Sequence, residues 1–455
     1  MHSYKNEMYN LIKLAVPVLI ASISQTSMNF VDTIMAGGVS TIDMAAVAIA
    51  SSIWLPLILF GAGLLTALVP IVAQLNGSDQ QIKIPFEIQQ GISLAIICSI
   101  PIIMILLQIR TILDIVKLEP LITIKISGYI YAMIFSVPAC LLFQTLRSLT
   151  DGLSLTKPAM VIGIIGLIIN IPINWMLVYG KFGLPKLGSI GCGIATSIVY
   201  WLMFIMLLIY ILISKRIAHI QLFFHFYKPR VQSIIKLFKL GIPIGAATFI
   251  EVTLFAIVAL FIAPLGPNVV SAHQIAINFS SLIFMLPMSI GVAVSIRVGH
   301  QLGKRNLKGA KITSKVAVTI GFFLALITAI STIIFRENIV LLYSNNNTVT
   351  SIAMELLLFA AFYQCTDAIQ IISAGALRGY KDMKSIFNRT FISYWILGLP
   401  IGYILSMTNI IVEPMGVHGF WIGFIIGVSS AAFLLSLKLH MIHHNKSIKL
   451  KFISK

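Results

Sequence analysis

Three acidic residues lie inside stretches that otherwise have the composition of membrane-spanning helices: Asp32, Glu251 and Asp367. The whole chain of 455 residues holds only 14 acidic residues. An ionisable side chain at membrane depth costs at least ~2.5 kcal/mol on insertion scales, so it is rare unless it performs a task. The chemistry that these carboxylates offer is the binding of a proton, a small cation or a cationic substrate. They are therefore the first candidates for a functional site.

The residues around Asp32 can complete one polar site in the N-terminal half. With ~1.5 Å of rise per residue, Asp32 is expected ~6 Å below the outer end of the first span. Asn174 in the fifth span and Thr196 in the sixth lie at comparable depth, and Asn170 is one turn deeper than Asn174 on the same face. We expect these four side chains to meet. A carboxylate with amide and hydroxyl oxygens can hold a proton or a small hard cation, although the neutral members can instead serve only as hydrogen bonds between helices.

A second set of polar residues lies in the C-terminal half. Tyr363 and Asp367 are four residues apart, which places them on one face of the tenth span. Glu251 in the seventh span is expected at similar depth, and Asn278 in the eighth a little shallower. Two carboxylates and a phenol offer a site for a cation such as sodium, and two close carboxylates can alternatively share one proton. For Asn278, a hydrogen bond between helices is the alternative.

The elements that must position these residues are membrane helices. Hydrophobic residues make up 58% of the chain, charged residues only 10%, and the mean hydropathy is +0.99, whereas soluble domains carry about 25% charged residues. Pro138 falls inside the fourth predicted span, where a proline often kinks a helix. About 20 apolar residues cross the hydrocarbon layer. This length predicts twelve spans, at residues 10–36, 45–73, 91–109, 122–146, 159–179, 189–213, 235–264, 270–296, 313–335, 349–377, 389–407 and 416–437.

The basic residues set the expected topology. The formal net charge is +18, but Lys and Arg flank apolar segments, so membrane topology explains the charge better than nucleic-acid binding. With both termini and the even-numbered loops on one side, that side holds 26 of the 32 basic residues. The positive-inside rule then places both termini in the cytoplasm. The C-terminal residues form a basic cytoplasmic tail in this topology.

The chain repeats itself once. KLAVP at 13–17 matches KLGIP at 239–243, and Leu-Arg at 146–147 followed by Asp151 matches Leu-Arg at 377–378 followed by Asp382. In each repeat the Arg and the Asp are four residues apart, so we expect two i,i+4 pairs at the cytoplasmic ends of the fourth and tenth spans. Matches in the same order at nearly constant offset indicate duplication. We therefore expect an all-α membrane protein of two six-helix bundles, related by a pseudo-two-fold axis along the membrane normal. The expected domains are an N-terminal lobe at 1–213, a cytoplasmic linker at 214–234 and a C-terminal lobe with the basic tail at 235–455.

The sequence holds no motif for an enzyme or for nucleotide-driven transport. G-x-x-x-x-G-K-[ST] is absent, since the nearest match, GHQLGK at 299–304, has the wrong spacing, and H-E-x-x-H is also absent. The four cysteines form no ligand set with one another or with histidine. Without a cofactor or a nucleotide site, transport must draw on a gradient of sodium or protons.

The residues together resemble the multidrug and toxic compound extrusion (MATE) transporters, most closely the NorM-type branch. The matching elements are P-V-L-I…F-V-D-T-I-M-A-G at 17–37, G-I-P-I-G…E at 241–251, and Y-Q-C-T-D-A-I-Q…G-A-L-R-G at 363–379. The resemblance implies efflux of organic cations by exchange against sodium or protons. It assigns Asp32 to the N-terminal site, and Glu251, Tyr363 and Asp367 to the C-terminal cation site.

The predicted function is therefore an ion-coupled multidrug antiporter of the cell inner membrane that works by alternating access as a monomer. A flippase for lipid-linked sugars is the nearest alternative, but it needs a strongly cationic cavity for pyrophosphate, and the buried charges here are acidic. A membrane-embedded transferase would need an Asp-rich metal motif at a membrane face, and the sequence has none. A pore is a third alternative, although nothing indicates a ring of symmetric subunits.

Overall fold

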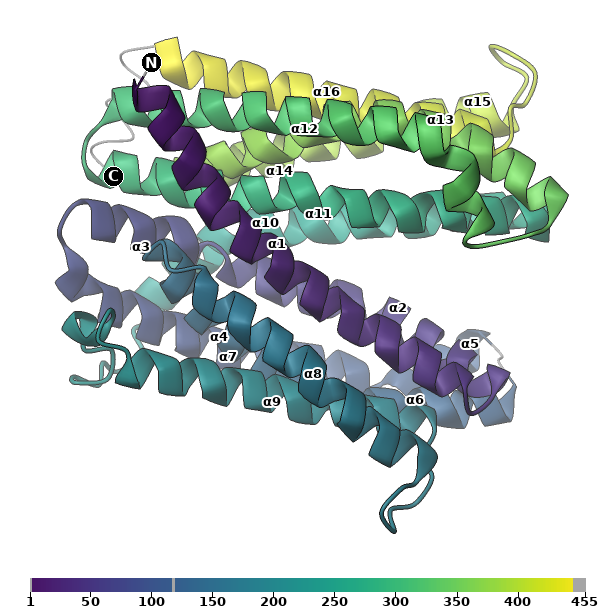
Figure 1. The fold of residues 1–455 in the computed structure, drawn as a ribbon, viewed down its shortest axis with the longest axis horizontal. Coiled ribbons are helices and arrows are strands. Elements are labelled where there is room, and N and C mark those ends of the chain that lie inside the picture. Colours follow the sequence, from purple (N-terminus) through teal and green to yellow (C-terminus); the bar gives the residue numbers. More distant parts are fainter. Residues whose placement is uncertain (1, 117–118, 445–455) are drawn as a thin grey trace. The chain divides into compact units, whose positions relative to one another are not determined.

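The computed structural model describes residues 2–116 and 119–444, and within them every regular element is a helix (Figure 1). Eleven of these helices are long and apolar enough to cross a membrane, and α6 with α7 forms a bent pair that makes a twelfth. This result confirms the predicted number of spans. Most of the predicted basic C-terminal tail, at residues 445–455, lies outside the described residues.

The bend between α6 (Pro120–Ile134) and α7 (Ser136–Gly152) measures 43°. Pro138 has no N–H to donate to the carbonyl of Ile134, one turn earlier, so the helical hydrogen bonding is broken at this point. The kink expected from Pro138 is therefore present, at the position of the fourth predicted span.

The packing divides the chain into two compact units, which are described separately. We call Pro17–Thr248 the N-unit, and Met1–Val16 with Phe249–Lys455 the C-unit. Two helices change unit along their length: α1 (His2–Gly37) and α10 (Val231–Ile262). The lobe boundaries expected from the sequence, at 1–213 and 235–455, stay a prediction.

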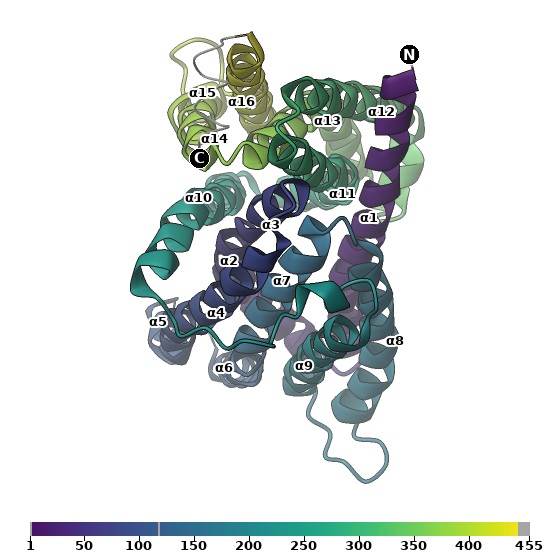
Figure 2. The same ribbon diagram turned by 90° about the vertical axis from the view of Figure 1, so that its left-hand side faces the viewer.

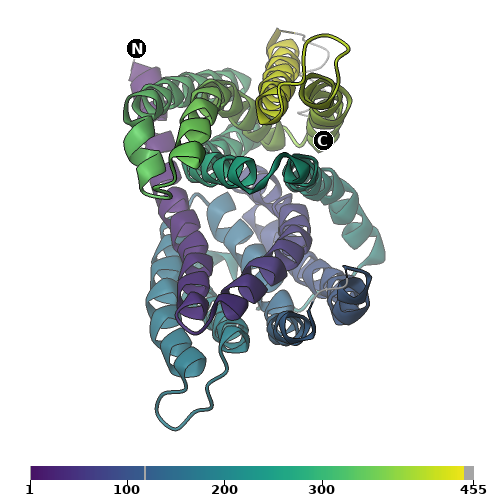
Figure 3. The same cartoon turned by 90° about the vertical axis from the view of Figure 1, so that its right-hand side faces the viewer.

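In the N-unit, α9 packs against α8, α7, α6 and α2. Figure 3 shows the turn-rich loop that joins α8 to α9. Buried apolar side chains from α2, α4 and α6 form much of the core. The other helices of this unit are α2 (Thr41–Leu65), α3 (Leu68–Gly77), η1 (Gln81–Lys83), α4 (Ile84–Leu107), α5 (Ile109–Val116), α8 (Lys157–Tyr179), α9 (Ser189–Ile213) and η2 (Ala218–Ile220).

The connection predicted at 214–234 is fixed to α4 by two buried glutamines. Gln89 Nε2 donates to the carbonyls of Leu222 and His225, at 2.7 and 2.8 Å. The Oε1 of Gln90 accepts from the amide of Arg230 at 2.8 Å. These bonds satisfy backbone groups of an irregular segment, so the linker is held in one path along the N-unit.

In the C-unit, α13 packs against α11, α12 and α16 (Figures 1 and 2). Two glycines allow α11 and α13 to approach closely, because a Cβ built on Gly375 would fall 2.2 Å from the carbonyl oxygen of Gly291. The other helices of this unit are η3 (Ala263–Leu265), α11 (Pro267–Gly303), α12 (Leu307–Leu341), α13 (Asn347–Gly379), α14 (Met383–Phe391), the π-helix η4 (Ile392–Gly398), α15 (Leu399–Met407) and α16 (Val417–His444).

Candidate functional site

Asp32 lies at the centre of a buried polar cluster in the N-unit. Asn174 on α8 donates from Nδ2 to Asp32 Oδ1 at 2.7 Å, and Thr196 on α9 donates to Asp32 Oδ2 at 2.7 Å. Asn170 accepts from Asn174 Nδ2 at 3.0 Å and lies 3.4 Å from the Thr196 hydroxyl. All four side chains are at most 1% exposed. The structure thus brings together the four residues that the depth argument placed in one site, while their role in binding stays a prediction.

A second polar cluster, around Asp43, holds the first residue of α9 near this site. Asp43, which is buried, accepts from the backbone N–H of Ser189 at 2.8 Å and pairs with Lys125 on α6 at 2.7 Å. The Ser40 hydroxyl accepts the Asp43 N–H and donates to Asp43 Oδ2, so Ser40 caps the start of α2 and helps to hold the Asp43 carboxylate. Thr196 lies two turns further along α9, so this cluster fixes the helix that presents Thr196 to Asp32. Sequence reasoning missed Asp43, although its position three residues after Ser40 is a recognisable capping signal.

The C-unit places Tyr363 and Asp367 on successive turns of α13. Asp367 is 2% exposed, and its Oδ1 has no hydrogen-bond partner among the described residues. Glu251 on α10 is partly buried and interacts electrostatically with both Asp367 and Arg378. The structure therefore brings the two predicted carboxylates within range of each other's charge. Asn278, the fourth residue expected here, has an exposed side chain.

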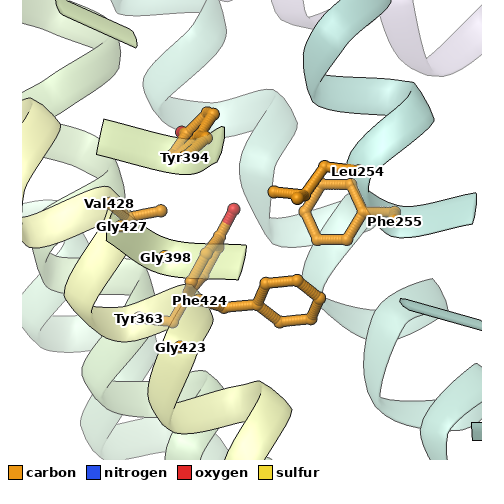
Figure 4. Close-up of a pocket in the computed structure, with 9 residues that line it drawn as sticks. All are labelled: Leu254, Phe255, Tyr363, Tyr394, Gly398, Gly423, Phe424, Gly427 and Val428. Atoms are coloured by element: carbon orange, nitrogen blue, oxygen red, sulfur yellow. The ribbon is translucent and has the colours of Figure 1, made fainter. Parts of the chain in front are cut away.

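Tyr394 is a further polar residue beside this group that the sequence did not single out. It lies in the π-helix η4, its hydroxyl is buried without a partner in the described part of the chain, and it interacts electrostatically with Glu251 and Asp367. Tyr363 and Tyr394 line one small pocket with apolar side chains, and the Tyr363 phenol extends toward the space between Tyr394 and Leu254 (Figure 4). π-helical turns often occur at functional sites.

The repeated Arg and Asp residues behave differently in the two units. Arg147 and Asp151 both lie in α7 and form the expected i,i+4 ion pair at 3.4 Å. The prediction of a matching ion pair between Arg378 and Asp382 is wrong, because Asp382 pairs instead with Lys438 on α16, at 3.5 Å. The physical reason is that α13 ends at Gly379, so Asp382 no longer shares a helical face with Arg378.

The oxygen ligands that the two candidate sites offer suit a singly charged ion. No group of three or more His, Cys, Asp or Glu side chains is placed to hold a metal ion in residues 2–116 and 119–444. What the described residues offer is one or two carboxylates with hydroxyl and amide oxygens. Such sets match a proton or a monovalent cation, since a divalent ion prefers more carboxylate charge.

Known proteins resemble this chain along nearly its full length. The MatE family model matches residues 17–176 and 243–404. The chain is 62% identical to the multidrug resistance protein NorM of Vibrio vulnificus, over 99% of both chains, and 50% identical to the multidrug resistance protein MdtK of Yersinia enterocolitica, over 98% of both. By shape it matches crystal structures of the eukaryotic MATE transporter AtDTX14, with a TM-score of 0.91 at 22% identity over 99% of both chains, and of the Vibrio cholerae MATE transporter VcmN, with 0.86 at 16% over 99% of both.

These similarities confirm the predicted fold class, an all-helical membrane protein of twelve spans in two bundles. They also confirm the prediction that the protein is a transporter and not an enzyme, since the relatives are transporters along their full length. The chain belongs to the MatE family of multidrug and toxic compound extrusion transporters.

Proposed function

We propose that this protein exports organic cations across the cell inner membrane in exchange for sodium ions or protons. The full-length similarity to NorM and MdtK proteins, which are named for multidrug resistance, supports small, chemically varied drugs as the substrates. Both termini are proposed to be cytoplasmic, and the working unit is proposed to be a monomer.

One observation carries the coupling proposal. Each unit buries an acidic side chain without an ion-pair partner in the described residues, Asp32 in one and Asp367 in the other. Asp32 stands among neutral polar groups, and the charge that Asp367 senses is the like charge of Glu251. Burying an isolated carboxylate is costly, so each is expected to take up a cation or a proton during the cycle. The ion and the drug then favour different conformations of an alternating-access cycle. This is required because a ligand shifts a conformational equilibrium only through its differential affinity for the two conformations.

Ethidium efflux from proteoliposomes under separately imposed sodium and pH gradients tests this proposal. We expect efflux to begin when one inward gradient is imposed and to stop when an ionophore dissipates it. Equal efflux with and without both gradients contradicts ion coupling. Absence of efflux of ethidium and of other cationic drugs under every gradient contradicts the proposed substrate class.

A further inference from the structure

The linker between α9 and α10, at residues 214–230, connects two helices that are long and apolar enough to cross a membrane. One helix ends at Ile213 and the other begins at Val231, and both of these residues are exposed. Figure 2 shows the linker running from α9 past α4 to α10. Both ends of the linker are therefore held at one surface of the membrane.

The bonds between the linker and α4 give the depth of the linker. Gln89 and Gln90 bond to backbone groups between Leu222 and Arg230, and the Tyr227 amide donates to Gln89 Oε1 at 2.8 Å. The two glutamines lie about 8 Å beyond the first residue of α4. The apolar stretch predicted to cross the membrane, at 91–109, follows them directly. The linker thus runs beside α4 at the level where the hydrocarbon layer begins.

The linker has a buried side and an exposed side. Ile217, Ile220 and Leu222 belong to a buried apolar cluster of the N-unit. Phe224 and Phe226 point away from that cluster and are 69% and 82% exposed. Two adjacent phenyl rings gain free energy when they leave water, and the boundary between headgroups and acyl chains accepts such rings.

Basic side chains flank these rings. Lys215, Arg216, Lys228 and Arg230 are all exposed, and the sequence has no acidic residue between positions 214 and 250. The Arg230 guanidinium lies 5.3 Å from the ring centre of Phe86 on α4, which orients this side chain beside the linker. Exposed cations at a membrane surface attract the negative charge of anionic lipids.

We propose that the linker binds anionic phospholipids of the leaflet that it adjoins. Phe224 and Phe226 enter the boundary between headgroups and acyl chains, and the four cations hold headgroup phosphates. Apolar and electrostatic attraction act together here, as they do in helices that bind membrane surfaces. A cytosolic partner fits less well, because the bonds to Gln89 and Gln90 hold the rings at the level of the lipid. The proposal goes beyond drug export and does not depend on ion exchange.

A nitroxide label at Phe226→Cys, in the full chain without its four native cysteines, reports where the linker lies. In nanodiscs that contain phosphatidylglycerol, we expect this label to collide more often with oxygen, which concentrates in lipid, than with a water-soluble nickel chelate. A label at Gln80→Cys, in the exposed connection between α3 and η1, is the control and should collide more often with the chelate. A label at Phe226→Cys that favours the chelate as strongly as the control overturns the proposal.

The association of spin-labelled phosphatidylglycerol and phosphatidylcholine with the protein measures its preference for anionic lipid. The triple variant Lys215→Gln, Arg216→Gln, Lys228→Gln removes three linker cations. It keeps Arg230, because that guanidinium also packs on Phe86. We expect the ratio of the two association constants to fall by about twofold or more.

The matched control removes the same number of charges elsewhere. The triple variant Lys304→Gln, Arg305→Gln, Lys308→Gln changes exposed residues at the turn between α11 and α12, and should keep the lipid preference of the wild type. A loss confined to the linker variant supports the proposal. Equal ratios in the wild type and the linker variant overturn it. Equal losses in the linker variant and the control also overturn it, because the effect then follows the net charge and not the linker.

Discussion

Thr196 on α9 donates a hydrogen bond of 2.7 Å to Oδ2 of Asp32 on α1, while Asn174 occupies Oδ1 at 2.7 Å. This pattern fits an ionised carboxylate, which accepts on both oxygens. A protonated Asp32 must donate from one oxygen, so a neighbour has to turn and become an acceptor. The Thr196 hydroxyl can do so by rotating, whereas the Asn174 Nδ2 cannot accept. A change of protonation at Asp32 therefore rearranges the cluster.

Asp32→Asn removes the charge and the exchangeable proton at nearly constant size. We expect the variant to lose the pH dependence of drug affinity, and to bind cationic drugs more weakly while binding neutral ones about as well. Affinities measured on both sides of neutral pH, for one cationic and one neutral compound, check this expectation. Superimposable pH curves for wild type and variant contradict a role of Asp32 in coupling.

Glu251→Gln and Asp367→Asn should each abolish ion-driven efflux in a protein that still folds. The amides keep the size and part of the hydrogen bonding, but they cannot neutralise a bound cation. Proteoliposome efflux under the driving gradient is the measurement, with purified yield and elution profile as the check on folding. Asp79→Asn, in an exposed turn, is the matched control and should transport normally. Normal coupled efflux in both site variants indicates that these carboxylates are structural.

The sequence was sufficient to predict the Asp32 cluster because helical geometry is regular. A constant rise per residue gives the depth of a side chain once the ends of a span are known, and a spacing of four residues gives the shared face of Asn170 and Asn174. The same reasoning placed Tyr363 and Asp367 on one face of α13. These are local relations along single helices, which apolar length and spacing determine.

Relations that depend on where a helix ends or loses its regular turn were not predictable in the same way. The expected pairing of Arg378 with Asp382 failed because α13 stops at Gly379. The inward position of Tyr394 depends on a π-helical segment, because the extra residue per turn changes which side chains face the interior. Asn278 is exposed because its rotation about α11 depends on packing against neighbours, which depth alone does not give.

Gly375→Ala should destabilise the C-unit strongly. The added Cβ would fall 2.2 Å from the backbone oxygen of Gly291, and a backbone atom cannot move aside as a side chain can. Overpacking of this kind costs about 1–3 kcal/mol or more. Thermal denaturation in detergent measures the loss. Gly163→Ala in α8 is the control, because its Cβ would meet its nearest atoms at 3.6 Å, which is ordinary contact. Equal melting temperatures for the two variants refute the close packing of α11 on α13.

The topology is tested by labelling single cysteines with a membrane-impermeant reagent in intact cells. Glu413→Cys, in the exposed loop between α15 and α16, should react from outside. An odd number of spans separates this loop from each terminus, so it lies on the opposite side of the membrane from cytoplasmic termini. Lys304→Cys, in the turn between α11 and α12, should react only after the membrane is opened. Background labelling is measured in a variant without Cys98, Cys140, Cys192 and Cys365. The reverse pattern refutes cytoplasmic termini.

Lys125→Met should lower the stability of the N-unit by about 1–3 kcal/mol, because it leaves the buried Asp43 carboxylate with neutral donors only. The lower end of this range is expected, since the Lys125 side chain is 25% exposed and water screens the ion pair. Lys186→Met, which removes an exposed cation in the loop between α8 and α9, is the matched control and should melt like the wild type.

The double variant of Lys125→Met with Asp43→Asn should recover part of the lost stability, because no buried charge then remains unpaired. Additive losses in the double variant contradict a direct pairing. If the pair positions the start of α9, Lys125→Met should also weaken binding of cationic drugs, whereas a purely stabilising pair changes the melting temperature alone.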